Sequence, residues 1–233
     1  MAAVLHLDGP CLVLAGAGSG KTRVITQKIA RLLQPGHGAD LAPSQIAAIT
    51  FTNKAAAEMR ERAKALVGSR AASKLLVCTF HSLGVRLLRE DGTALGLKPK
   101  FSILDSDDVL GILRDAGGTT DAKQARRWQW TISLWKNQGL NSSQAEAAAV
   151  DDDERICARV MRLYEERLLA YQAVDFDDLI GLSTKLLSDH PDVRAKWQHN
   201  VRHVLVDEYQ DTNATQYDML KLLVGERGIF TAV

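Results

Sequence analysis

The chain has 233 residues, of which 46% are hydrophobic and 24% are charged, and its formal net charge is +1. This length and balance are typical of a globular protein with a hydrophobic core, and they exclude a disordered, charge-rich chain. They also exclude attraction of nucleic acid by the total charge, so any DNA site must come from local clustering of residues.

The N-terminal segment does not have the pattern of a signal peptide. No Lys or Arg precedes its apolar run, and Asp8 interrupts that run. No part of the chain approaches the ~20 apolar residues that a membrane span needs. Cys11, Cys78 and Cys157 lie far apart without metal-ligand spacing, so reduced thiols are expected. We therefore expect a cytoplasmic protein with no membrane partner.

Short apolar runs alternate with amphipathic helices in the first 90 residues. Strands are expected at residues 11–14, which should be buried, and at 46–51 and 75–79. Helices are expected over about 21–33, 54–67 and 82–90. Thr52 or Asn53 is predicted to cap the second helix, and Gly68 to end it. This alternation predicts a parallel sheet with helices on both faces.

The pattern changes after about residue 90, because residues 105–199 carry helical signatures and no convincing strand. Helices are expected over 106–116, 121–138, 152–172, 175–188 and 191–198, with breaks at 117–120 and 139–143. Alternation resumes at the end, with a strand at 204–206, a helix at 214–224 and a strand at 229–233. The sequence thus predicts one α/β domain (residues 1–90 and 200–233) interrupted by a helical subdomain (residues 91–199).

Residues 15–22 lie between a predicted strand and a predicted helix, which is the context of a phosphate-binding loop. Glycines let such a loop wrap around phosphates, and the helix N-terminus adds its positive dipole end. Lys21 is expected to reach the β- and γ-phosphates of ATP, and the Thr22 hydroxyl to hold Mg²⁺. The strict pattern begins with glycine, where this chain has alanine, and a chance glycine-rich turn is the alternative. The candidate nucleotide-binding residues are Ala15, Gly16, Ala17, Gly18, Ser19, Gly20, Lys21 and Thr22.

An apolar strand at residues 204–206 is followed by two carboxylates, Asp207 and Glu208. Ligands of open parallel sheets bind beyond the carboxyl ends of the strands, so this pair and the phosphate loop are expected to meet at one edge. Asp207 is then placed to hold Mg²⁺, and Glu208 to orient and deprotonate the attacking water. Lys21, Asp207 and Glu208 are the candidate catalytic residues. The alternative is a strand end whose carboxylates are merely solvated.

Five segments resemble, in order, motifs of superfamily 1 DNA helicases of the UvrD, Rep and PcrA type, with the Rep type as the closest resemblance. They are residues 15–23 (AGAGSGKTR), 50–56 (TFTNKAA), 79–82 (TFHS), 175–179 (DFDDL) and 207–213 (DEYQDTN). The resemblance implies a RecA-like P-loop ATPase domain with an inserted all-helical subdomain. It also implies that ATP and Mg²⁺ are the cofactors.

The resemblance further implies that two phenylalanines stack on bases of single-stranded DNA. These are Phe51 and Phe176, and such stacking is sequence-tolerant because every base has a π-face. The residues by themselves leave another interpretation open, in which Phe51 and Phe80 belong to the core.

Polar residues of the same segments are expected to contact phosphates or sugars. They are Thr52, Asn53, Thr79 and His81, which lie at or just after the ends of predicted strands, where loops are exposed. Arg23 resembles a family residue that packs on the adenine. His81 as a buried histidine or helix cap, and Arg23 as an ordinary helix arginine, are the alternatives.

One predicted helix interleaves basic residues with tryptophans. The basic residues are Lys123, Arg126, Arg127 and Lys136, and the tryptophans are Trp128, Trp130 and Trp135. The pattern fits a DNA-contacting helix. A tryptophan stripe is more often part of a core, with flanking charges on a solvated face, so both interpretations stay open.

The resemblance predicts an ATP-dependent helicase that moves 3′ to 5′ on single-stranded DNA and acts at single-strand/duplex junctions in replication or repair. In that group an adenine-contacting glutamine precedes the first strand, and a second RecA-like domain supplies transition-state arginines. We therefore expect a fragment that binds nucleotide weakly, hydrolyses little and does not unwind. Two other classes share the loop: a small-molecule kinase, and a non-catalytic adaptor derived from a helicase.

Overall fold

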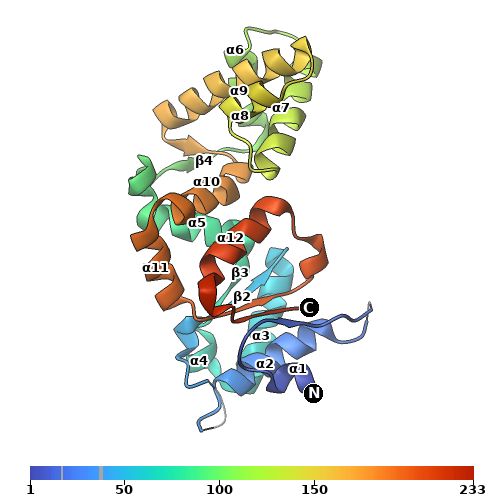
Figure 1. The fold of residues 1–233 in the computed structure, drawn as a ribbon, viewed down its shortest axis with the longest axis vertical. Coiled ribbons are helices and arrows are strands. Elements are labelled where there is room, and N and C mark those ends of the chain that lie inside the picture. The colour runs from blue at the N-terminus through green and yellow to red at the C-terminus, as the bar shows by residue number, and fades with distance from the viewer. Residues whose placement is uncertain (17, 37–38) are drawn as a thin grey trace. The chain divides into compact units, whose positions relative to one another are not determined.

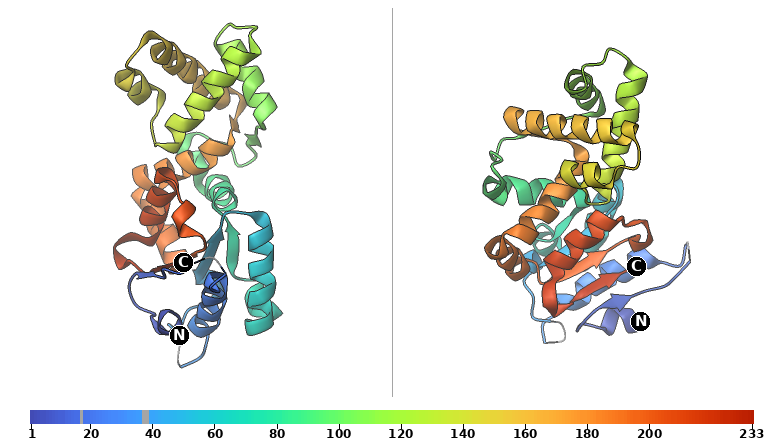
Figure 2. Two further views of the ribbon diagram at one scale, coloured as in Figure 1. Left: turned by 90° about the vertical axis from the view of Figure 1, so that its right-hand side faces the viewer. Right: turned by 45° about the horizontal axis from the view of Figure 1, so that its top comes forward.

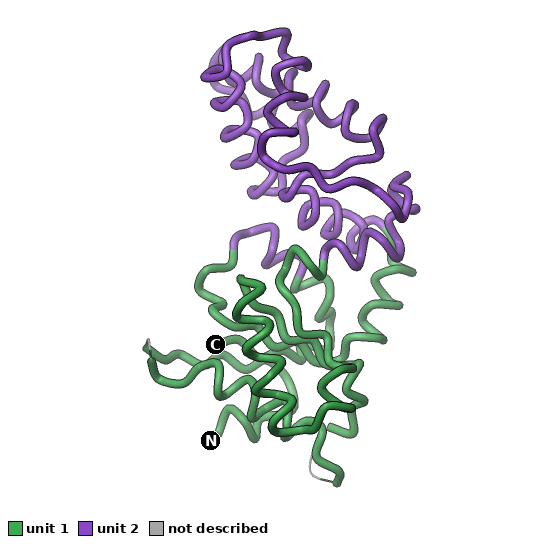
Figure 3. The backbone as a smooth tube through the Cα atoms, turned by 180° about the vertical axis from the view of Figure 1, so that it is seen from behind, with its two compact units in different colours: residues 1–83, 190–212, 220–233 green, residues 84–189, 213–219 purple. Residues whose placement is uncertain are grey.

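The computed structural model describes residues 1–16, 18–36 and 39–233. The chain forms two compact units, each discontinuous in sequence (Figure 3). Unit 1 contains residues 1–83, 190–212 and 220–233, and unit 2 contains residues 84–189 and 213–219. We keep the division into a domain (1–90 and 200–233) and an insertion (91–199) as a proposal, because compactness does not by itself define an independently folding domain.

Unit 1 is built on a five-stranded parallel sheet with the order β1-β7-β6-β2-β3 (Figure 1). The strands are β1 (Cys11–Leu12), β2 (Ile46–Thr50), β3 (Leu76–Thr79), β6 (His203–Val206) and β7 (Phe230–Ala232). Its helices are α1 (Ala2–Leu5), α2 (Lys21–Leu32), α3 (Asn53–Val67), α4 (Ser69–Ala72) and α11 (Pro191–Asn200). Both α5 (Phe80–Asp91) and α12 (Ala214–Val224) run from one unit into the other. The predicted parallel α/β sheet is confirmed.

Strands β2 and β6 lie inside the sheet, and their sequences are apolar except for Thr50 and His203. Every residue of β2 and β6 is buried, which requires cover on both faces of the sheet. Figure 2 shows α2 and α3 beside each other on one face, where Ile25, Ile29 and Met59 pack with Ile46 and Leu205. Thr52 caps α3 by accepting a hydrogen bond from the Ala55 N–H at 3.1 Å, and Gly68 ends it with φ of 83°.

The first strand differs from the expectation of a buried run over residues 11–14. The strand covers only Cys11 and Leu12, and Leu12 and Leu14 are 58% and 86% exposed. Strand β1 pairs with β7 alone, and both Leu12 and Leu14 line an open cavity of unit 1, which leaves their side chains accessible. An apolar sequence run indicates that a strand can be buried, but the tertiary surroundings decide whether it is.

Unit 2 is mainly helical. Its elements are β4 (Ser102–Ile103), α6 (Ser106–Ala116), α7 (Ala122–Asn137), α8 (Ser142–Ala148), α9 (Asp152–Tyr171), β5 (Ala173–Val174) and α10 (Phe176–Asp189). Its core is formed by one face each of α6, α7 and α9, with Leu113, Trp128, Trp135 and Tyr164 among the buried residues. Two tryptophans of the basic helix are therefore core residues, as the open alternative proposed.

The prediction that residues 105–199 contain no strand is wrong at β5. This strand pairs in parallel with β4, through Ser102 with Ala173 and Ile103 with Val174. Two-residue strands are too short to carry a periodic signal, and their partner is about 70 residues away in sequence, so local pattern does not reveal them. Helix α8 also begins inside the predicted break at residues 139–143. Among the described residues, no helix has the length and apolar character needed to cross a membrane.

Candidate nucleotide site and nucleic-acid interface

The glycine-rich loop connects β1 to α2 and takes conformations that only glycine adopts without strain. Gly18 and Gly20 have φ of 74° and 88°, and Gly20 is the residue before the first helical residue, Lys21. Inside the loop, Ser19 donates from both its N–H and its hydroxyl to the Gly16 carbonyl, at 3.3 and 2.5 Å. The loop therefore delivers Lys21 and Thr22 on the first turn of α2.

The acidic pair follows β6 and meets the first turn of α2. Lys21 Nζ lies 2.9 Å from Glu208 Oε2, and Thr22 Oγ1 donates to Asp207 Oδ2 at 3.1 Å. Glu208 is one of the few non-glycine residues with positive φ, at 53°, so the chain turns sharply at this carboxylate. The predicted meeting of the phosphate loop and the acidic pair at one edge of the sheet is thus present in unit 1.

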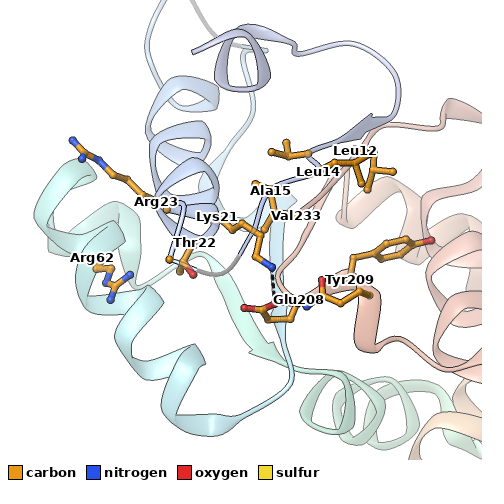
Figure 4. Close-up of a pocket in the computed structure, with 14 residues that line it drawn as sticks. Leu12, Leu14, Ala15, Lys21, Thr22, Arg23, Arg62, Glu208, Tyr209 and Val233 are labelled. Carbon is orange, nitrogen blue, oxygen red and sulfur yellow. Dashed lines mark hydrogen bonds and ion pairs between the residues drawn. The ribbon is translucent and has the colours of Figure 1, made fainter.

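A cavity of about 840 Å³ opens over this meeting point (Figure 4). Loop residues, the first turn of α2 and the segment after β6 form most of its wall, and Arg62 contributes from α3. The described lining residues are Leu12, Val13, Leu14, Ala15, Gly18, Gly20, Lys21, Thr22, Arg23, Arg62, Glu208, Tyr209, Gln210 and Val233. This volume is within the range of small-molecule sites.

Opposite shifts of pKa distinguish the two carboxylates. Asp207 is only 5% exposed, and burial raises its pKa. The hydrogen bond from Thr22 acts in the opposite direction but is the smaller effect. Glu208 is far more exposed, and hydrogen bonds from Lys21 and Gln210 lower its pKa. The lysine therefore keeps Glu208 ionised, and an ionised carboxylate is the form that can accept a proton.

Thr22 and Asp207 have the chemistry to bind a magnesium ion. Asp207 Oδ1 is buried and has no hydrogen-bond partner among the described residues. A hydroxyl and a single carboxylate are hard oxygen donors, which Mg²⁺ prefers, and in phosphate-transfer sites substrate phosphates and waters complete its shell. No cluster of three or more His, Cys, Asp or Glu is found in the described part of the chain.

Ala17 and Arg23 are also among the predicted nucleotide-binding residues. Ala17 lies outside the described residues. Arg23 lines the cavity, but its side chain extends away from the ion pair between Lys21 and Glu208 (Figure 4). Its packing on an adenine stays a prediction.

Residues predicted to contact DNA follow the ends of β2 and β3, which are paired neighbours with Thr50 opposite Thr79. Thr52 and Asn53 are exposed at the start of α3. Phe51 is half-buried and packs on the fully buried Phe80, with 5.4 Å between ring centroids and 59° between planes. Phe80 is thus a core residue, whereas Phe51 has part of its surface available for a ligand.

The segment after β3 is less accessible than its sequence suggests. Thr79 is 6% exposed, and its hydroxyl is hydrogen-bonded to both the N–H and the hydroxyl of Ser82 at the start of α5. His81 is half-buried in the first turn of α5. The prediction that Thr79 contacts DNA therefore depends on the resemblance alone, because its hydroxyl already serves the helix start.

Phe176 belongs to unit 2, where it is the first residue of α10 and is 55% exposed. The aspartates around it are held in place. Lys136 Nζ lies 2.7 Å from both Asp175 Oδ2 and Asp178 Oδ1, and Tyr164 donates to Asp175 at 2.8 Å. The partly exposed Phe176 ring thus follows directly after Asp175, which belongs to a buried charge cluster.

A second set of hydrogen bonds in unit 2 involves the end of the last motif. Asn213 Nδ2 donates to Asn137 Oδ1 at 2.7 Å, and Asn137 Nδ2 donates to Asp177 Oδ1 at 2.8 Å. Thr215 also donates to the carbonyl of Asn137, at 2.8 Å. Sequence reasoning missed Asn137 and the cavity residue Arg62. Neither lies in a motif, and the site segments beside them are distant in sequence.

Comparison with known proteins places the chain among helicases. The model of the UvrD/REP helicase N-terminal domain matches residues 1–233. The chain is 48% identical over 234 residues to the ATP-dependent DNA helicase Rep of Escherichia coli (strain K12), covering 99% of this chain and 34% of that protein. It is 43% identical to the ATP-dependent DNA helicase PcrA of Leuconostoc citreum, over 95% of this chain and 30% of that protein.

A third relative has a similar identity and coverage. The ATP-dependent DNA helicase UvrD1 of Mycobacterium tuberculosis (strain ATCC 25618 / H37Rv) is 44% identical, over 96% of this chain and 29% of that protein. The chain thus spans about a third of the length of the curated relatives it matches. The whole-chain match and the joined phosphate loop and acidic pair lead to one conclusion: the chain belongs to the UvrD/REP helicase N-terminal domain family.

Proposed function

We propose that these 233 residues form the ATP-binding part of an ATP-dependent DNA helicase that moves 3′ to 5′ on single-stranded DNA. One observation carries the proposal: Lys21 and Thr22 meet Glu208 and Asp207 at the mouth of a cavity of about 840 Å³. The names of the relatives support the choice of substrate, since all three are ATP-dependent DNA helicases.

Each residue of the site has a proposed task. The loop N–H groups and Lys21 bind the phosphates of ATP, and Lys21 exchanges its contact with Glu208 for the γ-phosphate when nucleotide enters. Thr22 and Asp207 are the protein ligands of Mg²⁺, which would supply charge neutralisation at the phosphates. Glu208, once released by Lys21, orients the attacking water and accepts its proton.

We propose that single-stranded DNA contacts Phe51, Thr52, Asn53, Thr79, His81 and Phe176. Partial exposure of Phe51 and Phe176 supports stacking on bases. Action at single-strand/duplex junctions, and a need for a second motor domain, belong to the same proposal. The need for a second motor domain is supported by the length of the relatives, since this chain matches only about a third of each.

Nucleotide binding by the 233-residue chain is the first test. Lys21→Ala should weaken binding of a fluorescent ATP analogue with Mg²⁺ by at least about tenfold, because a charge-assisted contact is lost. Lys74→Ala, which removes an exposed lysine elsewhere in unit 1, is the charge-matched control and should leave binding unchanged. Equal affinities of the Lys21→Ala variant and the unmodified chain would overturn the assignment.

Catalysis is tested in a chimera in which these residues replace the matching third of the Escherichia coli Rep helicase. Glu208→Gln should retain ATP binding and reduce single-strand-stimulated hydrolysis by ~100-fold or more, because a general base contributes 10²–10⁴-fold. Strand displacement should require ATP and a 3′ single-stranded tail. A chimera whose hydrolysis ignores single-stranded DNA would favour another class of P-loop enzyme.

A further inference from the structure

One face of α7 is exposed although it carries large apolar side chains. Trp130 is 70% exposed and Leu134 is 42% exposed, whereas Trp128 and Trp135 are 7% and 9% exposed in the core of unit 2. Residues four apart on a helix are surface neighbours, so Trp130 and Leu134 form one apolar pair. The packing of α7 within its own unit does not account for this pair.

Basic residues extend the same exposed face. Lys123, Arg126 and Arg127 are exposed, and Lys123 lies seven residues before Trp130, on the same side of the helix. Arg127 donates to Gln124 at 2.7 Å, and none of the three forms an ion pair with an acidic side chain in the described part of the chain. We call these three residues with Trp130 and Leu134 the α7 strip.

The arginines of the neighbouring helix α9 are paired with carboxylates instead. On α9, Arg155 lies 2.7 Å from Asp152, and Arg162 lies 3.2 Å from Glu166. The contrast means that the cations of the α7 strip are available to an anion from outside the unit. An apolar aromatic surface beside uncompensated cations matches the chemistry of nucleic acid, in which base faces alternate with phosphates.

The α7 strip continues toward the start of α10. Asn137 lies seven residues after Trp130 on the same side of α7, and it donates to Asp177, the neighbour of Phe176, at 2.8 Å. A cavity of about 160 Å³ is lined jointly by Gln129 and Ser133 of α7 and by Phe176. With ~1.5 Å of rise per residue, Trp130 and Asn137 are about 10 Å apart along the helix, a separation that a few nucleotides span.

We propose that the α7 strip binds single-stranded DNA as an extension of the contact at Phe176. The inference rests on the proposed function, because it takes the strand at Phe176 as its starting point. Lys123, Arg126 and Arg127 pair with phosphates, and Trp130 stacks on an unpaired base beside Leu134. A single strand is favoured over duplex because bases inside a duplex already stack on both faces and leave none for the indole ring.

The test measures binding of a fluorescein-labelled 16-nucleotide oligothymidylate to the 233-residue chain by anisotropy, at several salt concentrations. Trp130→Ala should weaken binding about tenfold, within the range measured for loss of one base–aromatic stack. Arg126→Gln combined with Arg127→Gln should reduce the slope of log affinity against log salt by about 1.4, because each lost single-strand phosphate contact removes ~0.7.

Matched controls on α9 separate these effects from general changes of the surface. Tyr171→Ala removes another aromatic residue, 62% exposed, and should leave affinity unchanged. Arg155→Gln with Arg162→Gln removes the same charge from guanidinium groups that are already paired, and should leave the salt slope unchanged. Circular dichroism melting of every variant checks that the fold is retained.

Tryptophan emission gives a second readout that does not depend on affinity. Trp130 is 70% exposed, whereas Trp128, Trp135 and Trp197 are 7%, 9% and 2% exposed, so stacking of a base should quench mainly Trp130. Quenching by saturating oligothymidylate should largely disappear in Trp130→Phe.

The outcomes distinguish this inference from the proposed function. If Phe176→Ala weakens binding while the α7 variants do not, the inference fails and the proposed function stands. If the unmodified chain binds no single strand, both fail. An equal loss of affinity for blunt duplex in Trp130→Ala would overturn the single-strand assignment. Sedimentation showing a dimer that Trp130→Ala dissociates, without an effect on DNA, would make the strip a contact between copies.

Discussion

At the scale of single residues, the acidic pair shows how neighbouring positions acquire different chemistry. Asp207 continues the sheet, with its N–H bonded to the Ile49 carbonyl at 2.9 Å, and is buried. Glu208 turns out of the sheet at positive φ and meets Lys21 near solvent. Two adjacent carboxylates thus become a buried metal-ligand candidate and an accessible base candidate, because the backbone directs them into different environments.

His203 makes a residue-scale prediction about pH. It is 1% exposed in β6 and its Nε2 lies 3.3 Å from Thr231 Oγ1, while burial, with the charges of Lys28 and His6, lowers its pKa to about 4. The unfolded chain binds the proton with a pKa near 6.5, so between pH 6.5 and 4 the unfolded state takes up more protons. The contribution of neutral His203 to the free energy of unfolding is therefore fully present above pH 6.5, and it is lost as the pH drops toward 4.

The measurement is the free energy of unfolding in urea at pH 7.5 and pH 4.5, for the unmodified chain and for His203→Gln. We expect the unmodified chain to lose roughly 2–3 kcal/mol more than the variant, since one pKa unit corresponds to ~1.4 kcal/mol. Parallel pH profiles of the two proteins would show that His203 is not shielded from protonation in the folded state.

At the scale of elements, helices α5 and α10 approach each other closely at a glycine of unit 2. A Cβ added at Gly84 would lie 2.1 Å from the Leu179 carbonyl oxygen, and Ser183 Oγ already donates to the Gly84 carbonyl at 3.3 Å. The contact is with backbone, which cannot rotate away, so the helices would have to move apart. Here glycine is needed for space between elements and not for its backbone conformation.

Alanine at two glycines should therefore have opposite effects on the midpoint of urea unfolding. Gly84→Ala is expected to destabilise by roughly 1–3 kcal/mol, because overpacking outweighs the gain in helix propensity. Gly181→Ala lies in α10 with no atom within 4 Å of the added Cβ, and is expected to stabilise by up to ~1 kcal/mol. If both substitutions stabilised the protein, the helices would not be in contact at Gly84.

The charge cluster that joins α7 to α10 gives another prediction at this scale. Burial and the charge of Asp175 raise the pKa of Asp178 to about 7. Burial alone would also raise the pKa of Asp175, but Lys136 overcomes this and lowers it. Lys136 is itself 8% exposed, so the cluster is a buried lysine balanced against two carboxylates.

Lys136→Met should destabilise the chain by about 3–5 kcal/mol at pH 8, because two buried carboxylates lose their counter-ion. Without the lysine, burial raises both folded-state pKa values above the unfolded ones. Protonation then favours folding, so the loss should be smaller at pH 5.5 than at pH 8. Adding Asp175→Asn and Asp178→Asn to Lys136→Met should recover part of the stability. A defect that does not change with pH would mean that charge is not its cause.

At the scale of the whole molecule, binding and turnover are expected to separate. The chain carries the loop and the acidic pair, whereas the resemblance assigns the transition-state arginines to a second motor domain, and such arginines are worth 10³–10⁵ in rate in related phosphoryl transfer. We expect the 233-residue chain to hydrolyse ATP ~10³-fold more slowly than the Rep chimera and to displace no strand. Steady-state phosphate release measures the rate, and similar rates for the two proteins would contradict this expectation.

The sequence by itself determined the parallel sheet and the elements of the nucleotide site. Strand–helix alternation, the glycines before Lys21 and the carboxylates after residues 204–206 are local patterns, and a parallel sheet brings the carboxyl ends of its strands to one edge. The meeting of Lys21 with Glu208 follows from these rules. The family resemblance was also carried by contiguous motifs.

Only the tertiary structure decided which predicted faces are covered. Periodicity predicted a helix over residues 121–138 but left open whether its tryptophans face the core, and the packing of α6 and α9 covers Trp128 and leaves Trp130 exposed. Likewise, Leu12 is exposed where it lines the open cavity, and Asn137 meets Asp177 from a segment 40 residues away. Sequence spacing defines which residues share a face, whereas burial depends on distant segments that spacing does not contain.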